Sequence, residues 1–364
     1  MKNLMTAAIL LSSAAAASAQ DIIRFKDGTA DQECEISKPS YKKVDYDITV
    51  GTKQAQSADN KRIAEIVVDK NLAPSSFDFN QGVVFMESNN LNDAIARFDR
   101  AKKDTRTREI IRQTAAINQV RCYFWNEDIQ GCLGAIQNLR QTQPESYYMK
   151  ETYEFEIKCC LAKRDLAGAQ RAITDLENKG NQENLPEWSR AADIQRGSLF
   201  EQQGKPREAL AIYRKYAGDK EAGDDAKMGE LRCLYGTGDW AGLNVRAQAI
   251  LADLRAKKST NDRLWTAAYN ASGESLLHEN KPKDALLDFM QGVTVYSRSG
   301  ASKENEVAVA RGGYACTRLA LAEKDKAKRD LWKGRAIDMY GDAKRQYGNG
   351  PLEVELKKAI DEVK

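Results

Sequence analysis

Small, aliphatic and aromatic residues recur at fixed spacings along the chain after residue 75. A small residue is followed twelve positions later by Ala, then four positions on by an aromatic residue, then three on by another small or apolar one. The clearest copies are Gly82/Ala94/Phe98/Ala101, Gly197/Ala209/Tyr213/Tyr216 and Gly273/Ala285/Phe289/Gly292. Spacings of three and four lie on one helix face, and the small residues allow a second helix to approach closely. The pattern therefore predicts pairs of short, packed helices.

These pairs follow one another along most of the chain, with turn residues between them. Self-similarity at roughly 34 to 45 residues is typical of helical solenoids, in which each hairpin buries its apolar face against its neighbours. We expect hairpins at residues 76–104, 107–142, 147–178, 187–217, 223–256, 260–298 and 303–347. A last helix from Leu352 to Val363 is expected to cap the array with its charged face, because a solenoid end needs a polar surface.

Residues 20–72 have a different pattern. Val44 and Tyr46 alternate with Asp45 and Asp47, which predicts a strand with one buried and one solvated face. Further short β-type stretches predict a four- or five-stranded sheet or a small, SH3-like barrel. Pro74 marks the junction with the helices. The predicted fold is mostly α: a right-handed α-solenoid of about seven hairpins over residues 76–364, preceded by a small β domain.

The first nineteen residues have the pattern of a signal peptide. Lys2 precedes the apolar stretch from Leu4 to Leu11, and Ala17-Ser18-Ala19 matches a small-residue cleavage site before Gln20. No other stretch approaches the length of a transmembrane helix. We therefore expect an exported protein of the periplasm or cell envelope, or a secreted one, with no transmembrane segment in the mature chain.

The net charge of the chain bears on one class of function, nucleic-acid binding. The sequence has 56 Lys and Arg against 53 Asp and Glu, a formal charge of +3. A nucleic-acid binder normally carries a clear basic excess or a basic stripe. No nucleic-acid partner is predicted.

Seven cysteines are present, and an odd number leaves at least one thiol unpaired within a monomer. Most of them occupy expected core positions of the hairpins, which favours small buried hydrophobic side chains. The alternative is a bridge joining Cys122 to Cys132 or Cys159, which export would permit. The spacing fits neither a zinc site nor a Cys-x-x-Cys motif.

The repeating positions resemble the tetratricopeptide repeat. The residues that carry the resemblance are Gly197, Phe200, Gly204, Ala209 and Tyr213 in the fourth copy, and Gly82, Phe85, Ala94, Phe98 and Ala101 in the first. The second and third copies are degenerate. The order of signal peptide, small β domain and repeats is similar to that of exported repeat proteins of Gram-negative-type bacteria, planctomycetes especially.

The resemblance implies that the first helix of each pair lines a concave groove that holds a protein segment. It places in this groove Phe79, Arg121, Phe124, Trp125, Lys158, Arg232, Tyr235, Asn270 and Glu274, with Val83, Ile117, Glu154, Met228 and His278 beside them. Aromatic residues and Arg are typical of interface hot spots. The clamp that binds peptide carboxyl termini in this family requires Lys and Asn where Phe79 and Val83 stand, so the sequence does not support that specificity.

Candidate catalytic residues are scarce. His278 is the only histidine, which excludes most His-based nucleophilic pairs and metal sites, and its place at the end of an expected helix favours a solvated or capping role. We expect no enzyme activity, no metal and no cofactor. The leading hypothesis is a non-enzymatic protein–protein interaction scaffold. The alternatives are a module that binds glycan or another envelope polymer, and a self-associating structural protein.

Overall fold

The computed structural model describes residues 20–48, 54–69, 76–219, 222–259, 261–296, 303–347 and 361. The predicted signal peptide, the junction at 71–75 and, apart from residue 361, the predicted capping helix lie outside the described residues. The chain forms two compact units, Met1–Ser189 and Arg190–Lys364, and each is described by itself.

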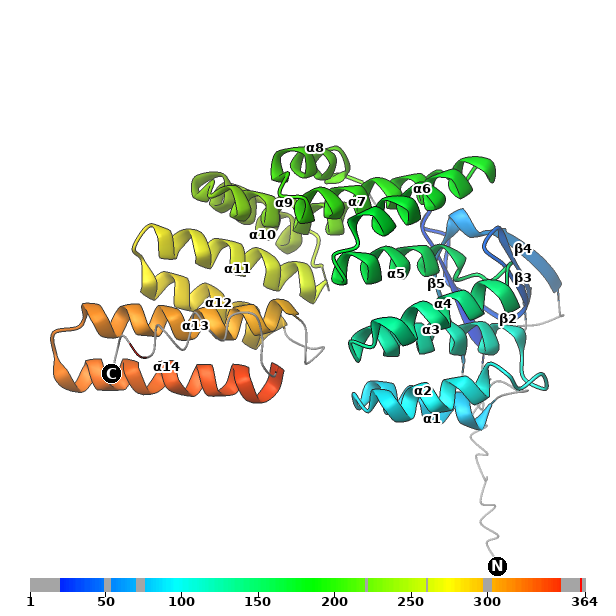
Figure 1. Ribbon diagram of the computed structural model, residues 1–364, viewed down its shortest axis with the longest axis horizontal. Helices are drawn as coiled ribbons and strands as arrows, with labels where there is room; N and C mark the ends of the chain where they lie inside the picture. The colour runs from blue at the N-terminus through cyan, green and yellow to red at the C-terminus, as the bar shows by residue number, and fades with distance from the viewer. Residues whose placement is uncertain are drawn as a thin grey trace, which may run out of the picture. The chain divides into compact units, whose positions relative to one another are not determined.

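The first unit begins with a five-stranded antiparallel sheet (Figure 1). Its strands are β1 (Asp21–Phe25), β2 (Gln32–Pro39), β3 (Lys43–Ile48), β4 (Gln54–Asp59) and β5 (Ile63–Val67), with a 3-10 turn at Asn60–Arg62. The spatial order is β4-β3-β2-β1-β5, so β5 returns to pair with β1 after the 3-10 turn.

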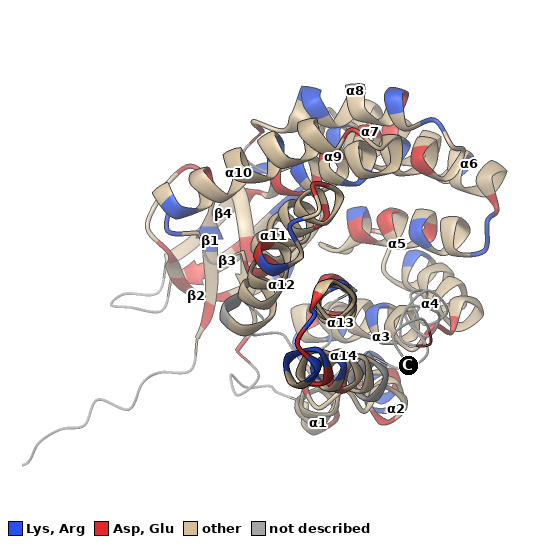
Figure 2. Cartoon of the chain, turned by 90° about the vertical axis from the view of Figure 1, so that its left-hand side faces the viewer, with Lys and Arg blue, Asp and Glu red and all other residues tan. Residues whose placement is uncertain are grey.

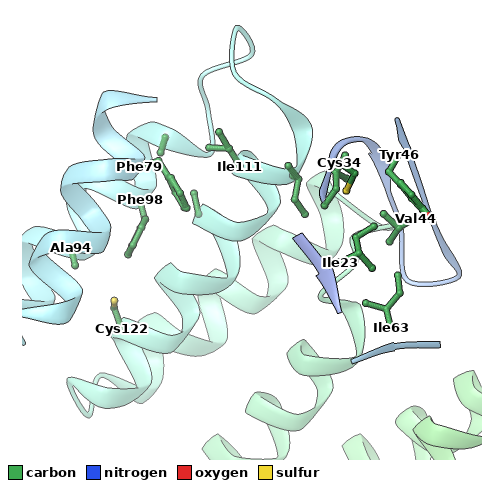
Figure 3. Close-up of a cluster of buried hydrophobic side chains, with 14 of the residues drawn as sticks. Ile23, Cys34, Val44, Tyr46, Ile63, Phe79, Ala94, Phe98, Ile111 and Cys122 are labelled. Carbon is green, nitrogen blue, oxygen red and sulfur yellow. The ribbon is translucent and has the colours of Figure 1, made fainter. Parts of the chain in front are cut away.

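One face of the sheet belongs to the hydrophobic core of the first helices. Val44 and Tyr46 of β3 are buried, as the alternation predicted. In Figure 3 they lie with Ile23 and Ile63 on the sheet side of a cluster that continues to Phe98 on the helical side. The sheet and the first hairpins therefore share one core, which suits a β domain too small to bury sufficient apolar surface alone.

A buried ion pair fastens the sheet to the helices. The carboxylate of Asp21 in β1 accepts a hydrogen bond from the Arg108 guanidinium at 2.5 Å, and its side chain is fully buried. The same carboxylate accepts the backbone N–H groups of Ile36 and Asp69, at 3.1 and 2.9 Å. Arg108 also donates to the carbonyl of Asp69 at 2.8 Å. Nothing in the local sequence pattern predicted this contact, because its partners stand 87 residues apart.

The remaining elements are helices. The first unit contains α1 (Phe77–Glu87), α2 (Leu91–Ala101), α3 (Glu109–Trp125), α4 (Ile129–Thr142), α5 (Met149–Ala162) and α6 (Leu166–Gln182). The second contains α8 (Pro206–Tyr216), α9 (Gly223–Thr237), α10 (Trp240–Ala256), α11 (Asp262–His278), α12 (Pro282–Tyr296), α13 (Lys303–Ala322) and α14 (Lys326–Tyr347), and α7 (Pro186–Gln202) crosses the boundary. Within the described residues the helices form seven hairpins, so the predicted fold class, a tetratricopeptide-like helical array after a small β domain, is confirmed.

The repeating glycines are positions of close helix contact. A Cβ added at Gly82 would lie 2.7 Å from the ring of Phe98, which is fully buried and cannot move aside. Equivalent atoms at Gly197 and Gly273 would lie 2.8 Å from Tyr213 and 2.7 Å from Phe289. The spacing of Gly and aromatic residue in the sequence is therefore a steric requirement of each of these three hairpins.

Three hairpin turns share a second signature. In each, an Asp caps the second helix by accepting the backbone N–H of the Gly three positions later: Asp128 with Gly131, Asp165 with Gly168, and Asp239 with Gly242. The residue before the Asp has a positive φ. A Cβ at Gly131 would lie 2.5 Å from the Asp128 carboxylate, so the glycine makes room for the cap.

Candidate protein-interaction site

The structure places five of the predicted groove residues inside the protein. Ile117 and Met228 are core residues, 0% and 5% exposed. Phe79, Asn270 and Glu274 make contacts between helices. Phe79 is 3% exposed, and its ring lies 6.1 Å from that of Phe98. Asn270 and Glu274 are 8% and 5% exposed. Asn270 donates to the carbonyl of Glu304 at 2.8 Å, and Glu274 is bound by Arg311. These three side chains hold neighbouring helices together, so they offer no surface to a partner.

The predicted arginines form ion pairs between consecutive first helices. Arg121 of α3 donates to both carboxylate oxygens of Glu151 on α5, at 2.7 and 2.8 Å. Arg232 of α9 does the same with Glu201 of α7, at 2.9 Å. Burial opposes the charge of Arg121, but the hydrogen bonds to Glu151 outweigh it and raise the pKa of the guanidinium. Such bidentate pairs fix the register of the helices and are already neutralised.

An aromatic contact joins α3 and α5 next to Trp125 in the sequence. Arg121 binds Glu151 and Phe124 packs on Phe155, so the two helices run in the same direction. The rings of Phe124 and Phe155 lie 5.3 Å apart, edge to face. The Nζ atom of Lys158 lies 4.8 Å from the centre of the Phe155 ring. On α3, Trp125 follows Arg121 by one turn.

Trp125 is 53% exposed. The structure gives its indole no hydrogen bond and no ring contact with any described residue. We call Phe124, Trp125, Phe155 and Lys158 the Trp125 patch. Three of its members were predicted from the sequence. Phe155 was not, because its buried position at the base of the patch depends on the neighbouring hairpin.

The second unit contains a separate aromatic cluster. Tyr235 at the end of α9 is 47% exposed, and its ring meets that of Trp240 edge to face at 5.3 Å. His278, the last residue of α11, stacks on Trp240: the two ring centres lie 3.5 Å apart, with an interplanar angle of 12°. We call these three residues the Tyr235 cluster. Trp240 was missed because it begins a second helix, directly after the Asp239 turn.

The described residues hold no group of three or more His, Cys, Asp or Glu side chains that could bind a metal ion. Their cysteines are all free thiols, with Cys160 half-buried and the other six buried. The Cys132 thiol donates to the Val120 carbonyl at 3.6 Å, and the neighbouring Cys159 thiol together with burial raises the pKa of Cys132. None of the helices within the described ranges is long and apolar enough to cross a membrane.

Charges of both signs are interspersed on the helices. Figure 2 shows basic and acidic residues side by side along α5, where Lys150 pairs with Glu154. On such a surface the exposed aromatic side chains, rather than a continuous field of one sign, distinguish one region from another.

No protein-family model matches the chain, and no curated protein matches it in sequence. Among solved structures, a tetratricopeptide repeat protein from Parabacteroides merdae is 13% identical, with 78% of this chain and 97% of that chain covered and a TM-score of 0.49. PilW, a widely conserved type IV pilus biogenesis factor, is 12% identical, with 67% and 98% covered and a TM-score of 0.43. The C-terminal part of a repeat-containing protein from Cytophaga hutchinsonii is 12% identical, with 76% and 98% covered and a TM-score of 0.37. Likenesses at this level assign no family, ligand or partner to the chain.

Proposed function

We propose that the protein is a non-enzymatic scaffold that binds a segment of another protein through the Trp125 patch. The observation that carries the proposal is the exposure of Trp125 on a first helix whose neighbouring Arg121 is already paired with Glu151. Large exposed aromatic side chains beside polar groups are typical of interface hot spots.

The size of the expected contribution follows from the exposed area. Half of a Trp side chain amounts to roughly 100 Å² of mostly apolar surface, and burying it contributes about 2–3 kcal/mol. A loss of about 2 kcal/mol corresponds to an affinity about thirty times weaker. Phe124 and Phe155 are already packed against each other, so these two patch residues require little ordering on binding.

The test is affinity purification of the tagged protein from its own envelope fraction, followed by comparison of variants. Trp125→Ala combined with Lys158→Ala removes the exposed parts of the patch and leaves the Arg121–Glu151 pair intact. Arg121→Ala is unsuitable, because it would leave Glu151 without its cation and disturb the α3–α5 contact. Val245→Ala is the matched control, since Val245 is 73% exposed on the second helix of another hairpin.

We expect the double variant to lose a stoichiometric partner that the wild type and the Val245→Ala variant both retain. Equal recovery of the partner by all three proteins would refute the Trp125 patch as the binding site. Retention on an envelope glycan without any protein would favour the polymer-binding alternative. Recovery of the protein only with itself would favour self-association.

For localisation we propose export to the periplasm, the cell envelope or the medium. The support comes from the sequence: the charge of Lys2, the apolar stretch from Leu4 to Leu11 and the Ala17-Ser18-Ala19 cleavage pattern. The layout of signal, β domain and repeats resembles that of exported bacterial repeat proteins, including planctomycete ones. Amino-terminal sequencing of the protein from fractionated cells tests this: Gln20 as the first residue supports export, and an intact Met1 in the cytoplasm contradicts it.

A further inference from the structure

A cavity lined mainly by polar and charged residues lies in the first unit, away from the Trp125 patch. It occupies about 490 Å³ between the turn that joins α2 to α3 and the turn that joins α4 to α5. The volume is in the range of sites that hold a small ligand or a few residues of a peptide. Its walls come from residues 102–113 on one side and 138–146 on the other. We call it the Arg112 pocket.

Three cations line the pocket, and two of them are already neutralised. Lys102 and Lys103 bind the Asp99 carboxylate, at 3.2 and 2.6 Å, and Lys102 also donates to the side chain of Gln119 at 2.6 Å. Arg112 differs: the structure gives its guanidinium no hydrogen bond and no ion pair with any described residue. Its charge acts on Asp104 only at longer range. Arg112 is therefore the cation that remains available in this pocket.

Two polar atoms of the lining are buried without a hydrogen-bond partner. One is the Nε atom of Arg112, a donor, and the other is the Oε1 atom of Gln143, an acceptor. The side-chain amide of Gln113, which also lines the pocket, has partners of its own. It donates to the Pro39 carbonyl and the Glu109 carboxylate, and it accepts the backbone N–H of Tyr147. Buried polar atoms without partners are uncommon in folded proteins. The walls of the pocket thus contain one cation and one amide whose hydrogen-bonding capacity is not fully used within the described residues.

We propose that the Arg112 pocket binds an internal acidic residue of an extended protein segment. The carboxylate would pair with the Arg112 guanidinium, whose planar donors match its geometry. Two carboxylates, Glu109 and Glu145, also line the pocket and disfavour ligands with several negative charges. A single acidic side chain suits this balance better than a polyphosphate. The inference is independent of the Trp125 patch.

The experiment uses the full chain and a minimal probe, the acetylated and amidated tripeptide Gly-Asp-Gly, with Gly-Asn-Gly as its neutral counterpart. Binding is followed by NMR of the arginine Nε–H groups during titration at low salt. The variants are Arg112→Gln, which removes the charge, and Arg112→Lys, which keeps the charge without the Nε donor. Arg106→Gln is the control, because Arg106 lies in the same turn but is 89% exposed and paired with Asp104.

We expect a saturable shift of one arginine Nε–H signal with the Asp peptide, and binding of the Asn peptide at least about tenfold weaker. Arg112→Gln should abolish the response, Arg112→Lys should weaken it, and Arg106→Gln should leave it unchanged. Equal responses to the two peptides, or a response that survives Arg112→Gln, would overturn the proposal, and so would no response of the wild type to millimolar peptide. Circular dichroism of each variant confirms that loss of binding does not come from unfolding.

Discussion

The steric role of the repeating glycines can be tested with two substitutions of the same kind. Gly82→Ala adds a methyl group 2.7 Å from the buried ring of Phe98, whereas Gly134→Ala in α4 adds one with no atom within 4 Å. Both positions are inside helices, so both variants gain about 1 kcal/mol of helix propensity. Only the first also overfills a core, at a cost of about 1–3 kcal/mol.

The two effects predict different changes in the free energy of unfolding for the two variants. Gly134→Ala should stabilise the first unit by up to about 1 kcal/mol. Gly82→Ala should be neutral or destabilise it by up to about 2 kcal/mol, so the two variants should differ by about 1–3 kcal/mol. Guanidinium unfolding followed by far-UV circular dichroism measures this difference, and the melting temperatures should differ by about 2–4 °C for each kcal/mol.

A second substitution shows whether the ring of Phe98 is the cause. Leu is smaller than Phe, so in the Gly82→Ala, Phe98→Leu double variant the added methyl group has space. The double variant should therefore lose less stability than the sum of the single variants, by about 0.5 kcal/mol or more. Equal stabilisation by Gly82→Ala and Gly134→Ala would refute the steric explanation of the repeat.

Three further predictions concern the buried and paired charges of the chain. Asp21→Asn should lower the free energy of unfolding of the first unit, measured in urea, by about 3–5 kcal/mol, because it leaves Arg108 buried without its charged partner. Asp31→Asn, at an exposed pair with Arg24, should change the free energy of unfolding by less than about 1 kcal/mol. Similar losses for both variants would contradict this prediction. Hydrogen bonds from Lys42, Lys179 and Tyr41 lower the pKa of Glu183 from 4.5 to about 2, so the stability they contribute is present above pH 4.5 and is lost as the pH falls to about 2. The melting temperature of Glu183→Gln should therefore lie below that of the wild type at pH 6 and equal it at pH 2, and a gap that persists at pH 2 would count against the assignment. Burial raises the pKa of Cys34, Cys122 and Cys233 to about 12, so iodoacetamide should label half-buried Cys160 first in the native protein and the buried thiols only after denaturation, as read by mass spectrometry; rapid native labelling of Cys122 would be inconsistent with this account.

Much of the fold could be predicted from the sequence because the interactions that define a hairpin are local. Gly82 and Phe98 stand sixteen residues apart, and the same spacing recurs at Gly197 with Tyr213 and Gly273 with Phe289. Helical periodicity and turn residues lie between them, so the pattern is visible along the chain. The Asp128–Gly131 type of turn was equally local, and attention to Asp followed three positions later by Gly would have found it.

The candidate site was less predictable because exposure depends on neighbouring hairpins. The resemblance placed Glu274 on a ligand-facing surface, but Arg311, 37 residues later, covers it with an ion pair. Phe79 was placed there too, yet it packs against Phe98 of its own hairpin. Periodicity identifies the helix face of a residue. It does not show whether that face meets another helix or solvent.

Two adjacent aromatic residues illustrate the same limit of predicting exposure from sequence periodicity. From the sequence alone, Phe124 and Trp125 were equally good candidates for a solvent-exposed aromatic side chain. The structure separates them, because Phe155 of the following hairpin covers Phe124 and leaves Trp125 half-exposed. The link between Asp21 and Arg108 was likewise beyond the reach of a local pattern.

The central claim, that Trp125 contacts a protein partner, is tested most directly by placing a photo-crosslinking amino acid at position 125 in cells that produce the protein. The matched position is 245, which is also exposed. The account predicts a crosslink from position 125 to one other protein and none from position 245. The same crosslinked products from both positions, or a partner that crosslinks from 245 and not from 125, would contradict it.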